Sequence, residues 1–167
     1  LWQVGTRVEQ SAHDVDNDFF TALSSSNSVS FNDKDYDAVS GSAGVVWSIN
    51  DRHSLAFNYA YSQRAPSASE IYAYGPHIGS GTYEVGGGFE LSNNAGQYSV
   101  VQSNDSMDKE VSNNLDLTYR YTGDTWNANV SIFNNDISDY VFESFTDLVI
   151  SDGAFISSAD YENQVAV

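Results

Sequence analysis

Residues 53–64 have the sequence HSLAFNYAYSQR, in which large apolar side chains alternate with small or polar ones. Successive side chains of a β-strand point to opposite faces, so this alternation predicts a strand with two different faces. One face carries apolar and aromatic residues: Leu55, Phe57, Tyr59 and Tyr61. The other carries small or polar residues: Ser54, Ala56, Asn58, Ala60 and Ser62. The solvent face of a soluble sandwich is usually rich in Lys and Glu, so these small neutral side chains favour a face that lines a channel.

The same alternation recurs along the chain in stretches of about ten residues, which is about the length of a tilted strand that crosses a bilayer. Further strands are predicted over residues 1–10, 36–49, 110–121 and 125–142, and a last one begins near Tyr161. The connections alternate in length: residues 50–52 and 122–124 are tight turns, whereas about 11–35, 65–109 and 143–160 are long loops. The predicted fold is therefore all-β, with about six antiparallel up-and-down strands of a transmembrane β-barrel, short turns on one side and long loops on the other.

The three tryptophans lie at the short-turn ends of their predicted strands. Trp47 precedes the first tight turn, Trp126 follows the second, and Trp2 begins the first strand. Indole rings prefer the headgroup level of a membrane, so we expect these residues to form an interfacial belt. Both ends of the chain lie inside predicted strands. We therefore expect residues 1–167 to be a single segment of a larger barrel, without a plug domain.

Composition excludes several classes of protein. Six basic residues against 23 acidic ones give a net charge of −17, which argues against nucleic acid as a partner. The absence of cysteine excludes disulfides and thiol chemistry, and no run of about 18 apolar residues predicts a membrane helix. The sequence contains no nucleophile elbow, phosphate loop or His-Glu-x-x-His motif, so we expect no enzyme activity.

A resemblance to a known family begins in residues 62–77, which read SQRAPSASEIYAYGPH. This run resembles the barrel motif of TonB-dependent receptors, in which a strand ending in Arg-x-Pro leads into a Glu-Ile/Leu-Tyr segment. Further similar blocks follow in the same order: 81–86 (GTYEVG), 109–117 (KEVSNNLDL), 121–126 (YTGDTW) and 161–164 (YENQ). The resemblance covers about residues 36–167 and is greatest to the zinc-uptake receptors, whose barrels carry a similar Tyr-x-x-Gly-x-His stretch. Residues 89–108 form an insertion relative to this pattern, in a region where external loops select ligands.

The resemblance implies a nutrient-uptake receptor in the outer membrane of a Gram-negative bacterium. Such receptors hold an N-terminal plug inside a barrel of about 22 strands and are energised through the TonB complex. The implied partners of this chain are outer-membrane lipid, the TonB complex by way of the plug region, and a small nutrient ligand, which is a metal ion such as zinc or a metal chelate. On its own, the chain is expected to self-associate through open strand edges.

Three residues of the motif run are candidate ligand-binding residues. Arg64 ends a predicted strand because Pro66 cannot donate to a ladder, and its guanidinium suits either a structural ion pair or a contact with ligand or plug. Glu70 completes a Ser67-x-x-Glu70 capping box, which predicts a short helix at the rim of the barrel. Tyr74 is the third candidate.

A second set of candidates could hold a metal ion in the external loops. It comprises His13, Asp14, Asp16 and His77. Imidazole and carboxylate groups are suitable ligands for zinc when no cysteine is offered. The acidic run after His13 also allows loose calcium binding, although Phe19 stands where an EF-hand requires glycine.

An alternative from another class is a soluble β-sandwich that serves as an adhesion or carbohydrate-binding module with acidic loops. The two hypotheses differ in what the apolar faces contact. A sandwich requires Trp47 and Trp126 to be buried in a core, whereas a barrel exposes its apolar face to lipid.

Overall fold

The computed structural model describes residues 1–17, 30–95, 97–104, 106–151 and 154–157. The chain divides into two compact units. The first comprises residues 1–12, 35–65 and 108–140, and the second comprises residues 13–34, 66–107 and 141–167. Among the described residues, no helix has both the length and the apolar character that a membrane crossing requires.

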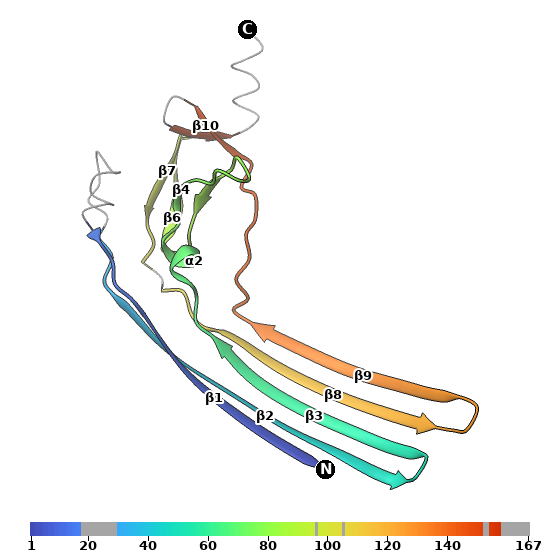
Figure 1. Cartoon of the computed structure of the whole chain (residues 1–167). Helices are drawn as coiled ribbons and strands as arrows, with labels where there is room; N and C mark the ends of the chain where they lie inside the picture. Colours follow the sequence, from blue (N-terminus) through green and yellow to red (C-terminus); the bar gives the residue numbers. More distant parts are fainter. Residues whose placement is uncertain (18–29, 96, 105, 152–153, 158–167) are drawn as a thin grey trace. The chain divides into compact units, whose positions relative to one another are not determined.

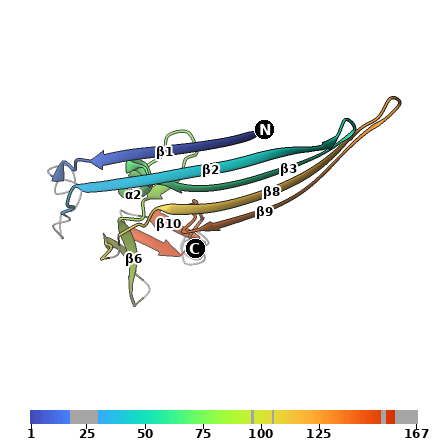
Figure 2. The ribbon, with the colours of Figure 1, turned by 90° about the horizontal axis from the view of Figure 1, so that it is seen from below.

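The first unit is an antiparallel sheet of five long strands. They are β1 (Trp2–His13), β2 (Lys34–Asn50), β3 (His53–Arg64), β8 (Glu110–Thr122) and β9 (Asn127–Ser138). Their order is β1-β2-β3-β8-β9, and both views show them running side by side and bending together (Figure 1; Figure 2). Five predicted strands are thus confirmed, and the all-β antiparallel fold with them. The strand predicted to begin near Tyr161 lies outside the described residues.

The fifth strand is shorter than its pattern predicted. Period-two alternation suggested a strand through residue 142, but β9 ends at Ser138. Asp139 has a φ of 55°, which is left-handed backbone and interrupts the extended conformation. The prediction was wrong at this end because alternation in side-chain type does not reveal a reversal of one φ angle.

Over most of the sheet, the register places mainly apolar residues on one face and mainly small or polar residues on the other. β9 departs from this pattern, because Phe133 pairs with Asp116 on the polar face and Asn134 pairs with Leu115 on the apolar face. Cross-strand rows on the apolar face are Val45–Phe57–Leu117–Ile132 and Trp47–Leu55–Tyr119–Val130. Rows on the opposite face include Ser42–Ala60–Asn114–Asn135 and Ser48–Ser54–Arg120–Asn129. The two-faced strand predicted from residues 53–64 therefore extends across β2, β3, β8 and β9.

The apolar face has no protein layer over it within the first unit. Trp47 is 61% exposed and Trp126 is 59% exposed, and Val45, Phe57, Leu117 and Ile132 are also exposed. A sandwich would have buried the two indoles, so the structure contradicts the alternative prediction. A contiguous exposed apolar surface of this kind indicates contact with lipid or another partner.

The second unit is built from the long connections and has a core of its own. It contains α2 (Ala68–Tyr72), the hairpin of β4 (Tyr74–Pro76) and β5 (Tyr83–Val85), and a four-stranded sheet in the order β10-β11-β7-β6. The strands of that sheet are β6 (Phe89–Asn94), β7 (Gln97–Gln102), β10 (Leu148–Ser151) and β11 (Ala154–Ser157). Phe31 and Phe89 are buried at its centre. The residues predicted as long loops thus contain short strands, because three to six residues carry too little periodicity to be recognised.

Candidate functional site

The short helix α2 begins as its sequence predicts. The backbone N–H of Glu70 donates to the Ser67 hydroxyl at 3.2 Å, and the backbone N–H of Ser67 donates to the Glu70 carboxylate at 2.7 Å. These two bonds form the capping box and satisfy two amides at the N-terminus of the helix. The predicted capping box is confirmed, so Glu70 positions the helix. Its proposed ligand contact stays a prediction.

Three consecutive glycines close the other end of α2. The backbone N–H groups of Gly86, Gly87 and Gly88 donate to the carbonyls of Ala73, Glu70 and Ile71 at 2.7–2.8 Å. A Cβ on Gly86 would lie 2.6 Å from the Ile71 carbonyl oxygen, so only glycine permits this approach. Helix ends leave carbonyl groups without intrahelical partners, and this segment supplies their donors. The sequence showed only a glycine-rich loop.

Tyr74 belongs to an aromatic cluster beneath the hairpin. Its ring lies 5.6 Å from the ring of Tyr83, at right angles, and 5.1 Å from the ring of Phe89. Phe31 lies 5.1 Å from Phe89 and 5.2 Å from Tyr72. Such edge-to-face pairs stabilise a cluster beyond the apolar area they bury. These ring contacts join the β4–β5 hairpin to α2.

The environment of Tyr83 alters its acidity. Burial, which is the largest cause, together with the charge of Tyr74 and a hydrogen bond between the two side chains, raises the pKa of Tyr83 to about 12. Each cause favours the neutral phenol over the phenolate. The Tyr83 hydroxyl is therefore protonated at neutral pH and can serve as a neutral hydrogen-bonding group for a ligand.

Two side-chain amides hold the backbone of Ser30 and Phe31 in place, and no pattern in the sequence predicts these contacts. The Asn17 side chain donates from Nδ2 to the Phe31 carbonyl at 2.9 Å and accepts at Oδ1 from the Phe31 N–H at 2.8 Å. Gln102 makes the same kind of paired contact with the backbone of Ser30, at 2.8 and 3.3 Å. The backbone that presents Phe31 to the core is thus held from two sides.

His77 is engaged at the tip of the β4–β5 hairpin. Its Nδ1 accepts from the backbone N–H of Ser80 at 3.1 Å, which places the proton of a neutral ring on Nε2. That nitrogen lies 3.8 Å from Oε1 of Glu84. A metal ion requires an unprotonated nitrogen, so metal binding by Nε2 would require the ring to give up its bond from Ser80 or lose its proton. No pattern in the sequence predicts this proximity of Glu84 to His77.

The other predicted metal ligands lie around the end of β1. Nε2 of His13 lies 3.1 Å from the carbonyl oxygen of Pro66, so it donates a hydrogen bond there, and the ring makes an edge contact with Tyr72. Asp14 is exposed at the start of the following segment, as is Asp16. Within the described ranges, no group of three or more histidines and carboxylates lies close enough to hold a metal ion. The metal assignment stays a prediction.

Arg64 ends β3 opposite the first residue of β8. Its Nη2 lies 3.2 Å from Oε2 of Glu110, and the same two residues are partners in the strand register. Lys109 adds a second link, since its Nζ donates to the Asp37 carbonyl at 2.6 Å and to Gln63 Oε1 at 3.1 Å. These contacts join β2, β3 and the start of β8 at the end of the sheet opposite the short turns.

Comparison with known proteins identifies the family. The model of the TonB-dependent receptor-like β-barrel matches residues 2–164, which is nearly the whole chain. No solved structure matches the chain. Members of this family are outer-membrane transporters of Gram-negative bacteria that interact with TonB, and they are not enzymes. The chain belongs to the TonB-dependent receptor β-barrel family and is part of an outer-membrane nutrient-transport protein.

Proposed function

We propose that the first unit is a part of the barrel wall, and that the second unit captures a scarce nutrient, a metal ion such as zinc or a metal chelate, outside the membrane. The observation that carries this proposal is the contrast between the two units. The sheet exposes both of its faces, as a wall between lipid and lumen does, whereas the long connections enclose their own core around Phe31 and Phe89. A folded external segment can hold ligand-binding side chains in fixed positions.

Among the possible nutrients, a metal chelate is better supported than a bare zinc ion. Tyr74 and Tyr83 offer partly exposed rings, and the Tyr83 hydroxyl is protonated, which suits a small organic ligand. His77 keeps a protonated nitrogen toward Glu84, which suits a hydrogen bond to an anionic or carbonyl oxygen of a chelate. The resemblance of residues 62–77 to the zinc-uptake receptors would favour the bare ion, so the test includes zinc.

The test is the metal content of the full-length receptor purified from outer membranes, measured by mass spectrometry. The comparison is with variants His77→Ala and His13→Ala, and with His53→Ala as the matched control on the sheet. Ion capture is established if the wild-type receptor and His53→Ala hold stoichiometric zinc whereas His77→Ala and His13→Ala hold none. If no variant or wild-type receptor holds zinc, and Tyr74→Ala weakens binding of a metal chelate, the chelate proposal stands. If every variant binds zinc and the chelate as the wild-type receptor does, the result contradicts a ligand site in the second unit.

Two partner proposals follow from the same arrangement. The TonB complex would engage a plug region that is separate from residues 1–167. The chain studied alone would self-associate, because β1 and β9 are the edges of the five-stranded sheet and carry unpaired backbone groups. Sedimentation of residues 1–167 in detergent should give a dimer or larger species. A stable monomer would contradict the self-association proposal.

A further inference from the structure

The apolar face of the five-stranded sheet becomes polar toward the end opposite the short turns. In that direction, the row Val45–Phe57–Leu117–Ile132 is followed by Ala43–Tyr59–Leu115–Asn134 and then by Gly41–Tyr61–Asn113–Asp136. Beyond the last of these rows, the same face of β3 carries Gln63, which pairs in register with Val111 of β8. Across β3 and β8, the face therefore passes from apolar to polar at the row of Tyr61 and Asn113.

Hydrogen bonds join polar side chains at this end of the sheet. Gln10 Nε2 of β1 donates to Asp37 Oδ1 of β2 at 3.0 Å. Lys109, directly before β8, donates from Nζ to the Asp37 carbonyl at 2.6 Å and to Gln63 Oε1 at 3.1 Å. Gln63 Nε2 donates to the Tyr61 hydroxyl at 2.6 Å. We call these five residues the polar belt. Because charged side chains are strongly disfavoured in hydrocarbon, Asp37 and Lys109 place the belt outside it.

The backbone ladder between β2 and β3 stops at the same row. Their register ends at the pair Gly41–Tyr61, although both strands continue beyond it and diverge (Figure 1). Beyond that pair, side chains accept from the backbone: the N–H of Val39 donates to Gln63 Oε1 at 3.1 Å, and the N–H of Gln63 donates to Ser40 Oγ at 3.3 Å. Hydrocarbon offers no partner to a backbone group, so strands that leave their ladder are expected only outside it.

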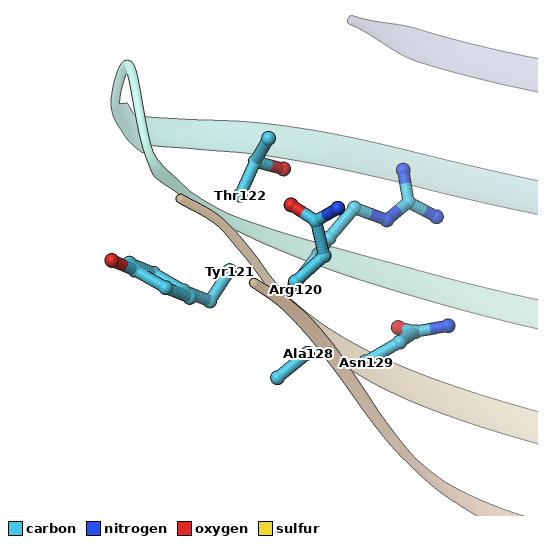
Figure 3. Close-up of a pocket in the computed structure, with 6 residues that line it drawn as sticks. Arg120, Tyr121, Thr122, Ala128 and Asn129 are labelled. Carbon is cyan, nitrogen blue, oxygen red and sulfur yellow. The ribbon is translucent and has the colours of Figure 1, made fainter. Parts of the chain in front are cut away.

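At the short-turn end, aromatic rings gather on the same apolar face. Figure 3 shows the ring of Tyr121 on one side of β8 and β9, with the side chain of Arg120 on the other. The Tyr121 ring lies 5.0 Å from that of His53 and 4.4 Å from that of Trp126. From His53 to Tyr61, β3 extends about 27 Å, which is about 21 Å along the membrane normal at a tilt of about 40°. The apolar band of an outer-membrane barrel is about 25 Å tall, so the belt lies near the height of the second interface.

We infer that the hydrocarbon layer ends at the row of Tyr61 and Asn113, and that the polar belt contacts the lipid head groups of the outer leaflet. Short turns lie at the periplasmic side of outer-membrane barrels, so the opposite end of the sheet lies in the outer leaflet. Head groups and their water supply donors and acceptors for the belt. The inference rests on the proposed wall role, because that role makes this face a lipid contact. It also assigns Val111 to the head-group layer, although its side chain is apolar.

The test uses nitroxide labels on single cysteines introduced at Leu115, Leu117 or Val111 of the full-length receptor in outer-membrane lipid. Electron paramagnetic resonance compares collisions with oxygen, which concentrates in hydrocarbon, and with a water-soluble nickel chelate, which hydrocarbon excludes. Labels at Leu115 and Leu117 should collide mainly with oxygen, whereas the label at Val111 should collide mainly with the chelate. Val111 is chosen because its side chain takes no part in the belt, so the label leaves those hydrogen bonds in place.

Each outcome decides the inference. Collisions dominated by the chelate at Val111 and by oxygen at Leu117 support it. Collisions dominated by oxygen at all three positions overturn it and leave the wall role intact, because hydrocarbon would then cover this face beyond the belt. Collisions dominated by the chelate at all three positions overturn the wall role as well, so the two failures are distinguishable. Few collisions with either reagent at Val111 would mean that another part of the receptor covers the belt, which also overturns contact with head groups.

Discussion

At the scale of single residues, Gly86 shows how the second unit depends on a close backbone approach. Its N–H donates to the Ala73 carbonyl at 2.7 Å, and an added Cβ would lie 2.6–2.8 Å from backbone atoms of Ile71 and Ala73. Gly87 is also crowded, but by the side chain of Met107, which can rotate away. The two neighbours therefore differ in what a methyl group would displace.

Gly86→Ala should loosen the second unit, whereas Gly87→Ala should have a smaller effect. Overpacking against backbone costs about 1–3 kcal/mol, so amides of α2 and of residues 86–89 should exchange faster with deuterium. The measurement is hydrogen exchange by mass spectrometry on the full-length receptor. Equal protection in Gly86→Ala and wild type would contradict the described closure of α2.

Tyr83 gives a prediction of pH dependence. Its pKa is raised from 10.0 to about 12 in the folded unit, so its contribution to stability is complete below pH 10 and is lost as the pH rises through about 12. Ultraviolet titration of the full-length receptor should therefore contain a late phenolate transition that Tyr83→Phe removes. Tyr74→Phe should lower the pKa of Tyr83 without restoring it to 10.0, because burial, the largest cause, persists. A Tyr83 transition near pH 10 in the wild-type protein would contradict the described cluster.

At the scale of elements, β8 has an apolar face, which we assign to lipid, and a polar face, which we assign to the lumen. Leu117 lies in the apolar row with Phe57 and Ile132, and Thr118 lies on the polar face, where its hydroxyl is 2.8 Å from that of Ser131. Adjacent residues of one strand thus face different surroundings. A charge introduced at these two positions should have different effects.

Leu117→Arg should destabilise the receptor in lipid by about 2–4 kcal/mol, the cost of arginine at the middle of a bilayer. Thr118→Arg is the matched control and should cost much less, because the charge faces the lumen. The urea midpoint of the full-length receptor refolded into lipid vesicles gives the comparison. Equal losses in the two variants would show that the faces of β8 are not distinct.

The elements differ in how well the sequence predicts them. The strand over residues 53–64 has the same bounds as β3, because a wall strand with two unlike faces repeats its pattern over many residues. β5 has only three residues and cannot be recognised from alternation. The Asn17 side chain bonds to the backbone of Phe31, and the backbone of Gly86 bonds to that of Ala73, so at least one partner in each contact is a backbone group. Such contacts leave no signal in side-chain type, whereas the capping box of Ser67 and Glu70 does.

At the scale of the whole molecule, the family identifies an outer-membrane transporter and the described sheet agrees with a segment of its wall. The sheet of the described residues has β1 and β9 as its edges and does not close into a barrel. The apolar face of the sheet then contacts lipid instead of a protein core. This assignment of the faces is the central claim, since the role of the sheet as a channel wall depends on it.

Nitroxide labels on single cysteines introduced at each of residues 54–62 of the full-length receptor in lipid would test the claim most directly. Electron paramagnetic resonance measures how readily oxygen, which concentrates in lipid, collides with each label. Collision rates should be highest at Leu55, Phe57, Tyr59 and Tyr61 and lower at the residues between them, with a period of two. Rates that are uniformly low, or that are highest at Ala56, Asn58 and Ala60, would contradict a lipid-facing apolar surface.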